Sequence, residues 1–172
     1  YQLALCCHKS QEQLRDLADQ LQKKYHTPVL IFIGDVGEYA FVEDMVKQTL
    51  DTFGSIDVLI NNAGISYIGL LTDMTIDDWN QIVATNLTSV FSACRCTVPS
   101  MVHNKSGRII NISSVWGNVG ASCEVAYSAC KGGINSFTRA LGKELAPSNI
   151  TVNAIACGVI DTDMNRCFSE EE

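Results

Sequence analysis

Basic residues are scarce in this chain, and long apolar runs are missing from it. Its 172 residues include 12 Lys and Arg against 19 Asp and Glu, which gives a formal net charge of -7 at pH 7. A nucleic-acid partner favours a basic face, so this balance argues against one. No apolar run approaches the ~20 residues that span a membrane. We therefore expect neither a nucleic-acid partner nor a membrane partner.

Paired metal-ligand patterns are also missing, although the chain has 8 cysteines and 3 histidines. No two cysteines have the Cys-x-x-Cys spacing, and Cys94 and Cys96 lie two apart on an expected helix, where they do not share a face. We therefore expect no metal site and no disulfide framework. Buried free thiols in a reducing cytoplasm explain these cysteines better, so we expect a cytoplasmic protein.

Apolar runs alternate with amphipathic stretches along the whole chain. The runs that predict strands cover residues 1–8, 28–34, 57–61, 107–113 and 150–156. Helical periodicity and two capping-box signals, Ser10-Gln11-Glu12-Gln13 and Thr75-Ile76-Asp77-Asp78, predict helices between them. Strands that are apolar on both faces and separated by helices predict a parallel sheet with helices on both sides. We expect one doubly wound α/β domain over residues 1–172.

Small and polar residues gather where these strands end. Asp35 follows the second strand, and Asn61-Asn62-Ala63-Gly64 closes the third. Ser113 and Ser114 end the fourth strand, and Cys157-Gly158 ends the fifth. Doubly wound folds bind ligands beyond the carboxyl ends of their strands. The pattern therefore predicts a ligand site at this edge of the sheet.

Tyr127 and Lys131 lie four residues apart in a helix that runs toward Pro147. That spacing places them on one helix face. A phenol has a pKa near ~10, and an ammonium held close to it favours the phenolate and lowers that pKa. Such a pair serves as a proton donor or acceptor near pH 7, with the Ser114 hydroxyl beside it to bond a substrate carbonyl. The spacing alone fits a solvated helix face equally well, so the surrounding motifs decide.

Several motifs follow one another in a fixed order along nearly the whole chain. They are Asp35-Val36, Asn61-Asn62-Ala63-Gly64, Val83-Ala84-Thr85-Asn86-Leu87, Ile110-Asn111-Ile112-Ser113-Ser114, Tyr127-x-x-x-Lys131, Ile150-Thr151-Val152-Asn153-Ala154 and Gly158-Val159-Ile160-Asp161-Thr162-Asp163. The set resembles the short-chain dehydrogenase/reductase family, and more narrowly its 3-oxoacyl-[acyl-carrier-protein] reductase-like branch. Each motif alone is weak evidence, whereas the ordered set is specific. The resemblance implies a Rossmann-like fold.

The resemblance also implies catalytic roles. Tyr127 would be the general acid for carbonyl reduction and the base in reverse, and Lys131 would lower its pKa and bond the nicotinamide ribose. Ser114 would orient the carbonyl, and Asn86 would hold a water in a proton relay. The cofactor supplies the hydride, and the protein supplies position and the proton. Asn86 has an alternative interpretation as an amide that satisfies a kinked helix, and we interpret Ser113 as structural.

Further residues would bind the cofactor if the resemblance holds. The expected contacts are Asp35 and the Val36 backbone at the adenine, Asn62, Ala63 and Gly64 at the adenosine ribose, Tyr127 and Lys131 beside the nicotinamide, and Gly158, Ile160 and Thr162 near its carboxamide. A glycine allows close approach of the backbone to a ligand. Each position has a simpler alternative: Asp35 ends a strand, Gly158 makes a turn, and Thr162 caps a helix.

The choice between NADP and NAD depends on the end of the first strand. His8 and Lys9 stand there, and no carboxylate is present to bond a ribose 2′-hydroxyl. Lys9 is placed to meet a 2′-phosphate, which favours NADP over NAD. The alternative is a solvated lysine before a helix cap.

The sequence departs from the family pattern in two places. It has no Gly-x-x-x-Gly-x-Gly turn with a preceding first strand, and it stops soon after Asp163, before the family's last strand. The family's first strand is central in the sheet, so the fold without it has two edges that face each other. We expect an internal portion of a longer protein. Residues 1–172 alone should bind cofactor weakly and show little activity, because the phosphate cradle is absent.

These observations predict an NADP-dependent reductase of a 3-oxoacyl thioester or similar ketone, with a small-molecule or acyl-carrier-protein-linked substrate. One alternative is a short-chain dehydrogenase for a sugar, polyol or steroid alcohol. Another is a truncated, catalytically silent binding subunit. The resemblance also implies a homo-oligomer, a dimer or tetramer, built on the helices of residues 75–102 and 127–146. Apolar residues on those helices have the alternative of facing the core: Ala93, Cys94, Val98, Ala129, Ile134, Phe137 and Leu141.

Overall fold

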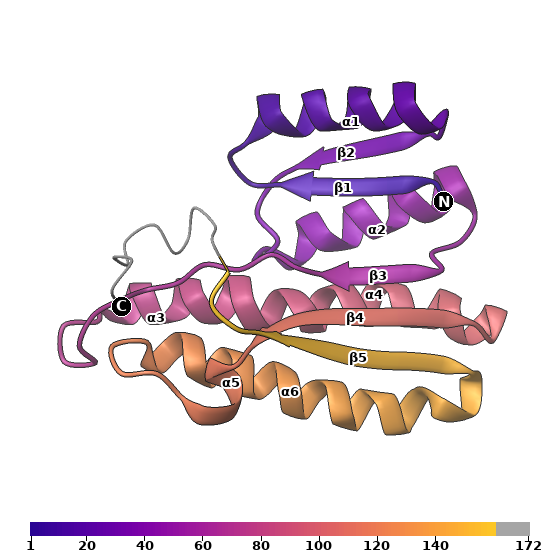
Figure 1. Cartoon of the computed structure of the whole chain (residues 1–172). Helices are drawn as coiled ribbons and strands as arrows, with labels where there is room; N and C mark the ends of the chain where they lie inside the picture. Colours follow the sequence, from indigo (N-terminus) through magenta and orange to yellow (C-terminus); the bar gives the residue numbers. More distant parts are fainter. Residues whose placement is uncertain (161–172) are drawn as a thin grey trace.

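The computed structural model describes residues 1–160, in which parallel strands alternate with helices (Figure 1). The first part consists of β1 (Leu3–Cys7), α1 (Gln11–Tyr25), β2 (Val29–Ile33) and α2 (Tyr39–Phe53). The second part consists of β3 (Val58–Asn61), α3 (Ile76–Val83), the π-helical turn η1 (Ala84–Thr88), α4 (Ser89–Asn104), β4 (Gly107–Ser114), α5 (Trp116–Val119), α6 (Val125–Leu145), the 3-10 turn η2 (Ala146–Ser148) and β5 (Ile150–Cys157). The α/β alternation expected from the sequence is confirmed.

The strands form two parallel sheets rather than one. β1 pairs with β2, and β4 lies between β3 and β5 in the second sheet. Among residues 1–160, β1 and β3 each lack a strand partner on one side, and Figure 1 shows these two strands on the facing sides of the two sheets. This is the arrangement predicted for a doubly wound sheet without its first strand. Two unpaired edges leave backbone groups open to another strand.

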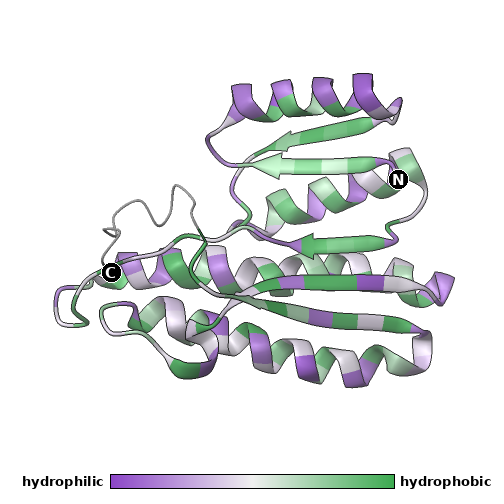
Figure 2. Cartoon of the chain, in the orientation of Figure 1, coloured by the Kyte–Doolittle hydropathy of each residue, from purple (hydrophilic) through white to green (hydrophobic). Residues whose placement is uncertain are grey.

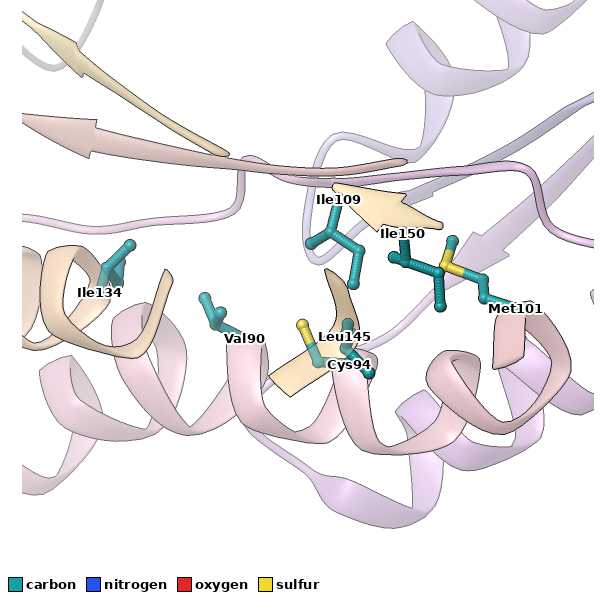
Figure 3. Packing of buried hydrophobic residues seen from close by; sticks show 7 residues of the cluster. All are labelled: Val90, Cys94, Met101, Ile109, Ile134, Leu145 and Ile150. Atoms are coloured by element: carbon teal, nitrogen blue, oxygen red, sulfur yellow. The ribbon is translucent and has the colours of Figure 1, made fainter. Parts of the chain in front are cut away.

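The helices of the second sheet pack on one of its faces. A buried cluster joins α4, β4, α6 and β5, and Figure 3 shows how its side chains meet; its members are Val90, Cys94, Met101, Ile109, Ile134, Leu145 and Ile150. A second cluster joins α2 to α4 through Val42, Val46 and Ala93. Most strand residues are apolar in Figure 2, yet Ile60 and Ile155 are 58% and 52% exposed. The sheet face opposite these helices is therefore open within the described residues, which differs from the expected cover on both sides.

The two expected capping boxes have different outcomes. Thr75 accepts a hydrogen bond from the Asp78 backbone N–H, and the Asp78 carboxylate accepts one from the Thr75 N–H, so α3 begins with a complete box. Ser10 precedes α1, but its side chain makes no cap hydrogen bond, so that prediction is wrong in its mechanism. The 75–102 helical stretch is continuous in direction but passes through the π-helical turn η1 between α3 and α4.

Most of the apolar residues that had an oligomer-interface alternative face the core. Ala93, Cys94 and Ile134 are buried, and Val98, Phe137 and Leu141 pack against the cluster that contains Cys94 and Ile134. Within residues 1–160, no helix combines the length and the apolar character that a membrane span requires.

Candidate active site

Helix α6 brings Tyr127 and Lys131 together, as the four-residue spacing predicts. The Lys131 ammonium lies 5.4 Å from the centroid of the Tyr127 ring. Lys131 is only 3% exposed, and its Nζ donates a hydrogen bond of 2.7 Å to the carbonyl of Ile112 in β4. Burial lowers the pKa of Lys131, while the neighbouring Cys130 and Cys157 oppose that effect. The lysine is thus a buried group held at the sheet, and not part of a solvated helix face.

Ser114, the last residue of β4, lies next to the phenol. A side-chain hydrogen bond joins Ser114 to Tyr127, and the Ser114 Oγ also accepts a 3.2 Å hydrogen bond from the backbone N–H of Trp116. Ser114 is 6% exposed. The hydroxyl and the phenol therefore approach each other from a strand end and a helix face, where one carbonyl oxygen can contact both.

The pKa of Tyr127 departs from the expected direction. Burial is the largest cause and raises the pKa, the Ser114 hydrogen bond lowers it, and Glu124 and Cys157 raise it again. The Lys131 ammonium, which was expected to lower this pKa, lies over the ring and donates to the Ile112 carbonyl. The net result is a phenol that keeps its proton through neutral pH. Such a group is prepared to donate a proton, and high pH is needed before it can accept one.

Asn86 lies in the π-helical turn η1 and is fully buried. Its Oδ1 accepts a 2.8 Å hydrogen bond from the Ile65 N–H, and its Nδ2 donates one of 2.8 Å to the Ile65 carbonyl. The alternative interpretation has this amide satisfy a kinked helix, whereas its hydrogen-bond partner is the Ile65 backbone, outside the helix. This contact fixes the segment that follows β3 against the site.

Gly64 belongs to that fixed segment and lies close to the catalytic candidates. A Cβ added at Gly64 would lie 3.3 Å from the Asn86 Oδ1 and 3.7 Å from the Lys131 Nζ. Asn62 and Ala63, just before it, are exposed. Gly64 therefore lies between the buried Asn86 amide and the Lys131 ammonium.

Asp35 and Val36 follow β2 at the same edge. The Asp35 Oδ1 accepts a 2.8 Å hydrogen bond from the Gly37 N–H, which closes the turn into α2. Val36 packs against the cluster of Val42 and Val46. Both residues thus have local structural contacts, in agreement with the simpler interpretation of Asp35 as a strand end.

The remaining cofactor candidates lie beyond β5. Gly158 and Ile160 are exposed, and a Cβ added at Gly158 would meet nothing within 4 Å. Thr162 lies outside the described residues. His8 and Lys9, on which the expectation of NADP rests, are exposed after β1.

Ser113, interpreted as structural, faces away from the reacting groups. Its hydroxyl donates a 3.3 Å hydrogen bond to the Lys131 carbonyl, and it is 2% exposed. A chain of amides continues this support: Asn61 donates to Asn111 at 2.8 Å, and Asn111 donates to Thr138 at 2.9 Å. These bonds tie β3, β4 and α6 together below the site.

Glu124 was missed by sequence reasoning. It is 8% exposed, and Ser66 donates a 3.1 Å hydrogen bond to its Oε2. Its charge raises the pKa of Tyr127. The available signal was a carboxylate three residues before the tyrosine, at the start of the same helix.

The site therefore combines Ser114, at the carboxyl end of β4, with Tyr127 and Lys131 on the neighbouring helix α6. The chain belongs to the short chain dehydrogenase family, whose model matches residues 1–172. It is similar to the 3-oxoacyl-[acyl-carrier-protein] reductase FabG of Chlamydia pneumoniae, with 41% identity over 79% of this chain and 55% of that protein. It is 46% identical to the 3-oxoacyl-[acyl-carrier-protein] reductase of Synechocystis sp., over 76% of this chain and 53% of that protein.

A further relative matches the whole chain. The uncharacterized oxidoreductase YmfI of Bacillus subtilis is 37% identical over 100% of this chain and 70% of its own length. The chain spans little more than half the length of the first two relatives, at 55% and 53%. Membership of this family implies a nicotinamide cofactor.

Proposed function

We propose that this protein, as a single Rossmann-like unit over residues 1–172 within a longer chain, reduces a ketone with NADPH. The observation that carries the proposal is the convergence of Ser114, Tyr127 and Lys131 at one site. The cofactor supplies a hydride to the carbonyl carbon. The chain's own residues then have to bind the carbonyl oxygen and deliver a proton to it.

Tyr127 is the proton donor in this proposal. Its raised pKa keeps Oη protonated, and the hydrogen bond with Ser114 orients the hydroxyl. Negative charge that develops on the carbonyl oxygen is stabilised by both hydroxyls, and the Tyr127 proton moves to that oxygen. Lys131 places a positive charge 5.4 Å from the ring centroid, which stabilises the negative charge on the phenolate left behind.

A 3-oxoacyl thioester, free or linked to acyl carrier protein, is the proposed substrate. Support comes from the names of two relatives, both 3-oxoacyl-[acyl-carrier-protein] reductases. NADPH is proposed over NADH because Lys9 is exposed after β1 and no carboxylate follows that strand. Asn86, Asp35, Val36, Asn62, Ala63, Gly64, Gly158, Ile160 and Thr162 keep their proposed roles from the sequence analysis.

We also propose a homo-oligomer in a reducing cytoplasm. On α4, Phe91 and Val102 are 49% and 40% exposed, which supports an apolar contact at this helix. The cysteines within residues 1–160 are free thiols, which is compatible with that compartment.

The test is NADPH oxidation by the whole protein with 3-oxoacyl thioesters beside a sugar ketone, a polyol ketone and a steroid ketone. We expect turnover of the thioester, a higher kcat/KM with NADPH than with NADH, and loss of that preference in Lys9→Glu. A higher kcat/KM for one of the other ketones would assign the substrate to that ketone's class instead. Cofactor binding without turnover of any ketone would favour the silent binding subunit and contradict the proposal.

A further inference from the structure

Lys131 is held by one segment of the chain at several points. Its Nζ bonds the Ile112 carbonyl at 2.7 Å, and its own carbonyl accepts the Ser113 hydroxyl at 3.3 Å. The third contact is made by Gly117, in α5. A Cβ added there would lie 2.6 Å from the Lys131 carbonyl carbon, 2.8 Å from the carbonyl oxygen and 2.9 Å from the Gly132 nitrogen. The backbone of α5 therefore rests directly on the backbone of α6 at the lysine.

Close approach, and not backbone conformation, requires glycine at position 117. Gly120 has a φ of +77°, whereas Gly117 has no positive φ and lies within the helical turn α5. The contact is two-sided, because a Cβ on Gly132 would lie 3.3 Å from the Gly117 carbonyl oxygen. One turn further along α6, Asn135 donates a 2.9 Å hydrogen bond to Asn118, which holds the two helices in this position.

We propose that Gly117 is a positioning residue. Its close contact with the Lys131 backbone sets the distance between α5 and α6, and this distance brings Lys131 and Tyr127 to Ser114. Ser114 ends β4, and Gly117 lies three residues later in α5. Residues 114–117 therefore carry both the hydroxyl for the carbonyl and the contact that places the proton donor. The inference deepens the proposed function and rests on it, because the position of α6 matters for turnover only if Tyr127 and Lys131 perform the chemistry.

The physical argument is steric. Contacts of 2.6 to 2.9 Å from a Cβ to backbone atoms cannot persist, so a methyl group at position 117 must move one helix against the other. Protein interiors are close-packed and transmit such strain. A misplacement of about 1 Å costs on the order of 10²-fold in rate. Because α6 carries both Tyr127 and Lys131, one shift displaces the two groups together.

The experiment compares three variants of the whole protein that each add one methyl group, Gly117→Ala, Gly132→Ala and Gly133→Ala. Gly133 is the matched control, since its Cβ would meet the movable side chain of Leu87 at 3.2 Å. We expect kcat for ketone reduction to fall about 10²-fold in Gly117→Ala, by less in Gly132→Ala and very little in Gly133→Ala. Gly132→Ala also carries the test if Gly117→Ala does not fold.

The pH profile separates positioning from a loss of stability. Separation of Tyr127 from Ser114 removes the hydrogen bond that lowers the phenol's pKa, so the alkaline limb of reduction should move to higher pH in Gly117→Ala. A lower melting temperature with an unmoved limb and an unchanged kcat in the folded fraction would overturn the inference.

Crystal structures of the wild type and Gly117→Ala show the position of α6 directly, without a measurement of turnover. We expect the Lys131 carbonyl to be displaced and the 2.7 Å bond from Nζ to the Ile112 carbonyl to lengthen. An unmoved Lys131 would overturn the inference even if ketones are reduced. A wild type that reduces no ketone would instead contradict the proposed function. The displacement of Lys131 would still decide whether Gly117 sets the position of α6.

Discussion

The two sheets of the molecule differ in how they are supported. Within residues 1–160, the buried apolar clusters take residues from α2, α3, α4, α6, β4 and β5, and none from β1, α1 or β2. β1, α1 and β2 form the smaller half of the molecule. Among their residues, only Leu14 and Ala18 of α1 are buried and apolar. A two-stranded sheet alone is marginally stable at best, whereas three strands packed against helices can be stable by themselves. The proton-transfer candidates Ser114, Tyr127 and Lys131 therefore belong to the better supported larger sheet and its helices. His8 and Lys9 belong to the smaller half.

The largest expected effect separates the two sheets by chemistry. Tyr127→Phe removes the proton donor of the larger sheet, and ketone reduction should fall by about 10²- to 10⁴-fold. Tyr25→Phe, in α1 of the smaller half, is the matched control and should keep its activity, because Tyr25 is 59% exposed. NADPH oxidation measures the rates, and the melting temperature checks that both variants fold. Equal losses in the two variants would contradict the assignment of Tyr127.

Core truncations should separate the sheets by stability. Ile109 in β4 is 0% exposed, and Ile109→Ala should lower the free energy of unfolding by about 3–5 kcal/mol. Leu14→Ala in α1 should cost less, about 2 kcal/mol, because Leu14 is 8% exposed and packs in the smaller half. Urea unfolding measures both. A larger cost at Leu14 would reverse the order of support described above.

The pH dependence of catalysis tests the electrostatics of the larger sheet. A phenol with a raised pKa stays protonated, so ketone reduction should hold steady through neutral pH and fall only in the alkaline range. Glu124 contributes to that raised pKa. Glu124→Gln removes the charge and should move the alkaline limb to lower pH, whereas the exposed Glu144→Gln on the same helix should not move it. Initial rates across pH with NADPH would show the shift, and coincident limbs in all three proteins would exclude it.

The smallest expected effect concerns the two helix caps. Thr75→Ala removes a formed capping box at α3 and should cost about 1 kcal/mol. Ser10→Ala at α1 removes a side chain that makes no cap bond, so its cost should be within about 0.5 kcal/mol. Thermal unfolding of the two variants makes the comparison, and equal costs would mean that Ser10 caps α1 in solution.

The order of the elements could be predicted from the sequence because it depends on local patterns. Apolar runs predicted every strand of the described chain within two residues, and the i, i+4 spacing of Tyr127 and Lys131 predicted their shared face. The pKa direction of Tyr127 could not be predicted, because burial and the Ile112 carbonyl act across the fold. Glu124 and Gly117 were missed for the same reason, since their contacts join segments that the local pattern does not pair.

The most direct test of the central claim follows the hydride in the presence and in the absence of the Tyr127 proton donor. The whole protein would be incubated with NADPH deuterated at the reactive carbon and a 3-oxoacyl thioester, and the product analysed by mass spectrometry. The account predicts deuterium at the former carbonyl carbon with the wild type, and almost none with Tyr127→Phe at equal cofactor occupancy. Deuterium transfer at the wild-type rate in Tyr127→Phe would contradict it.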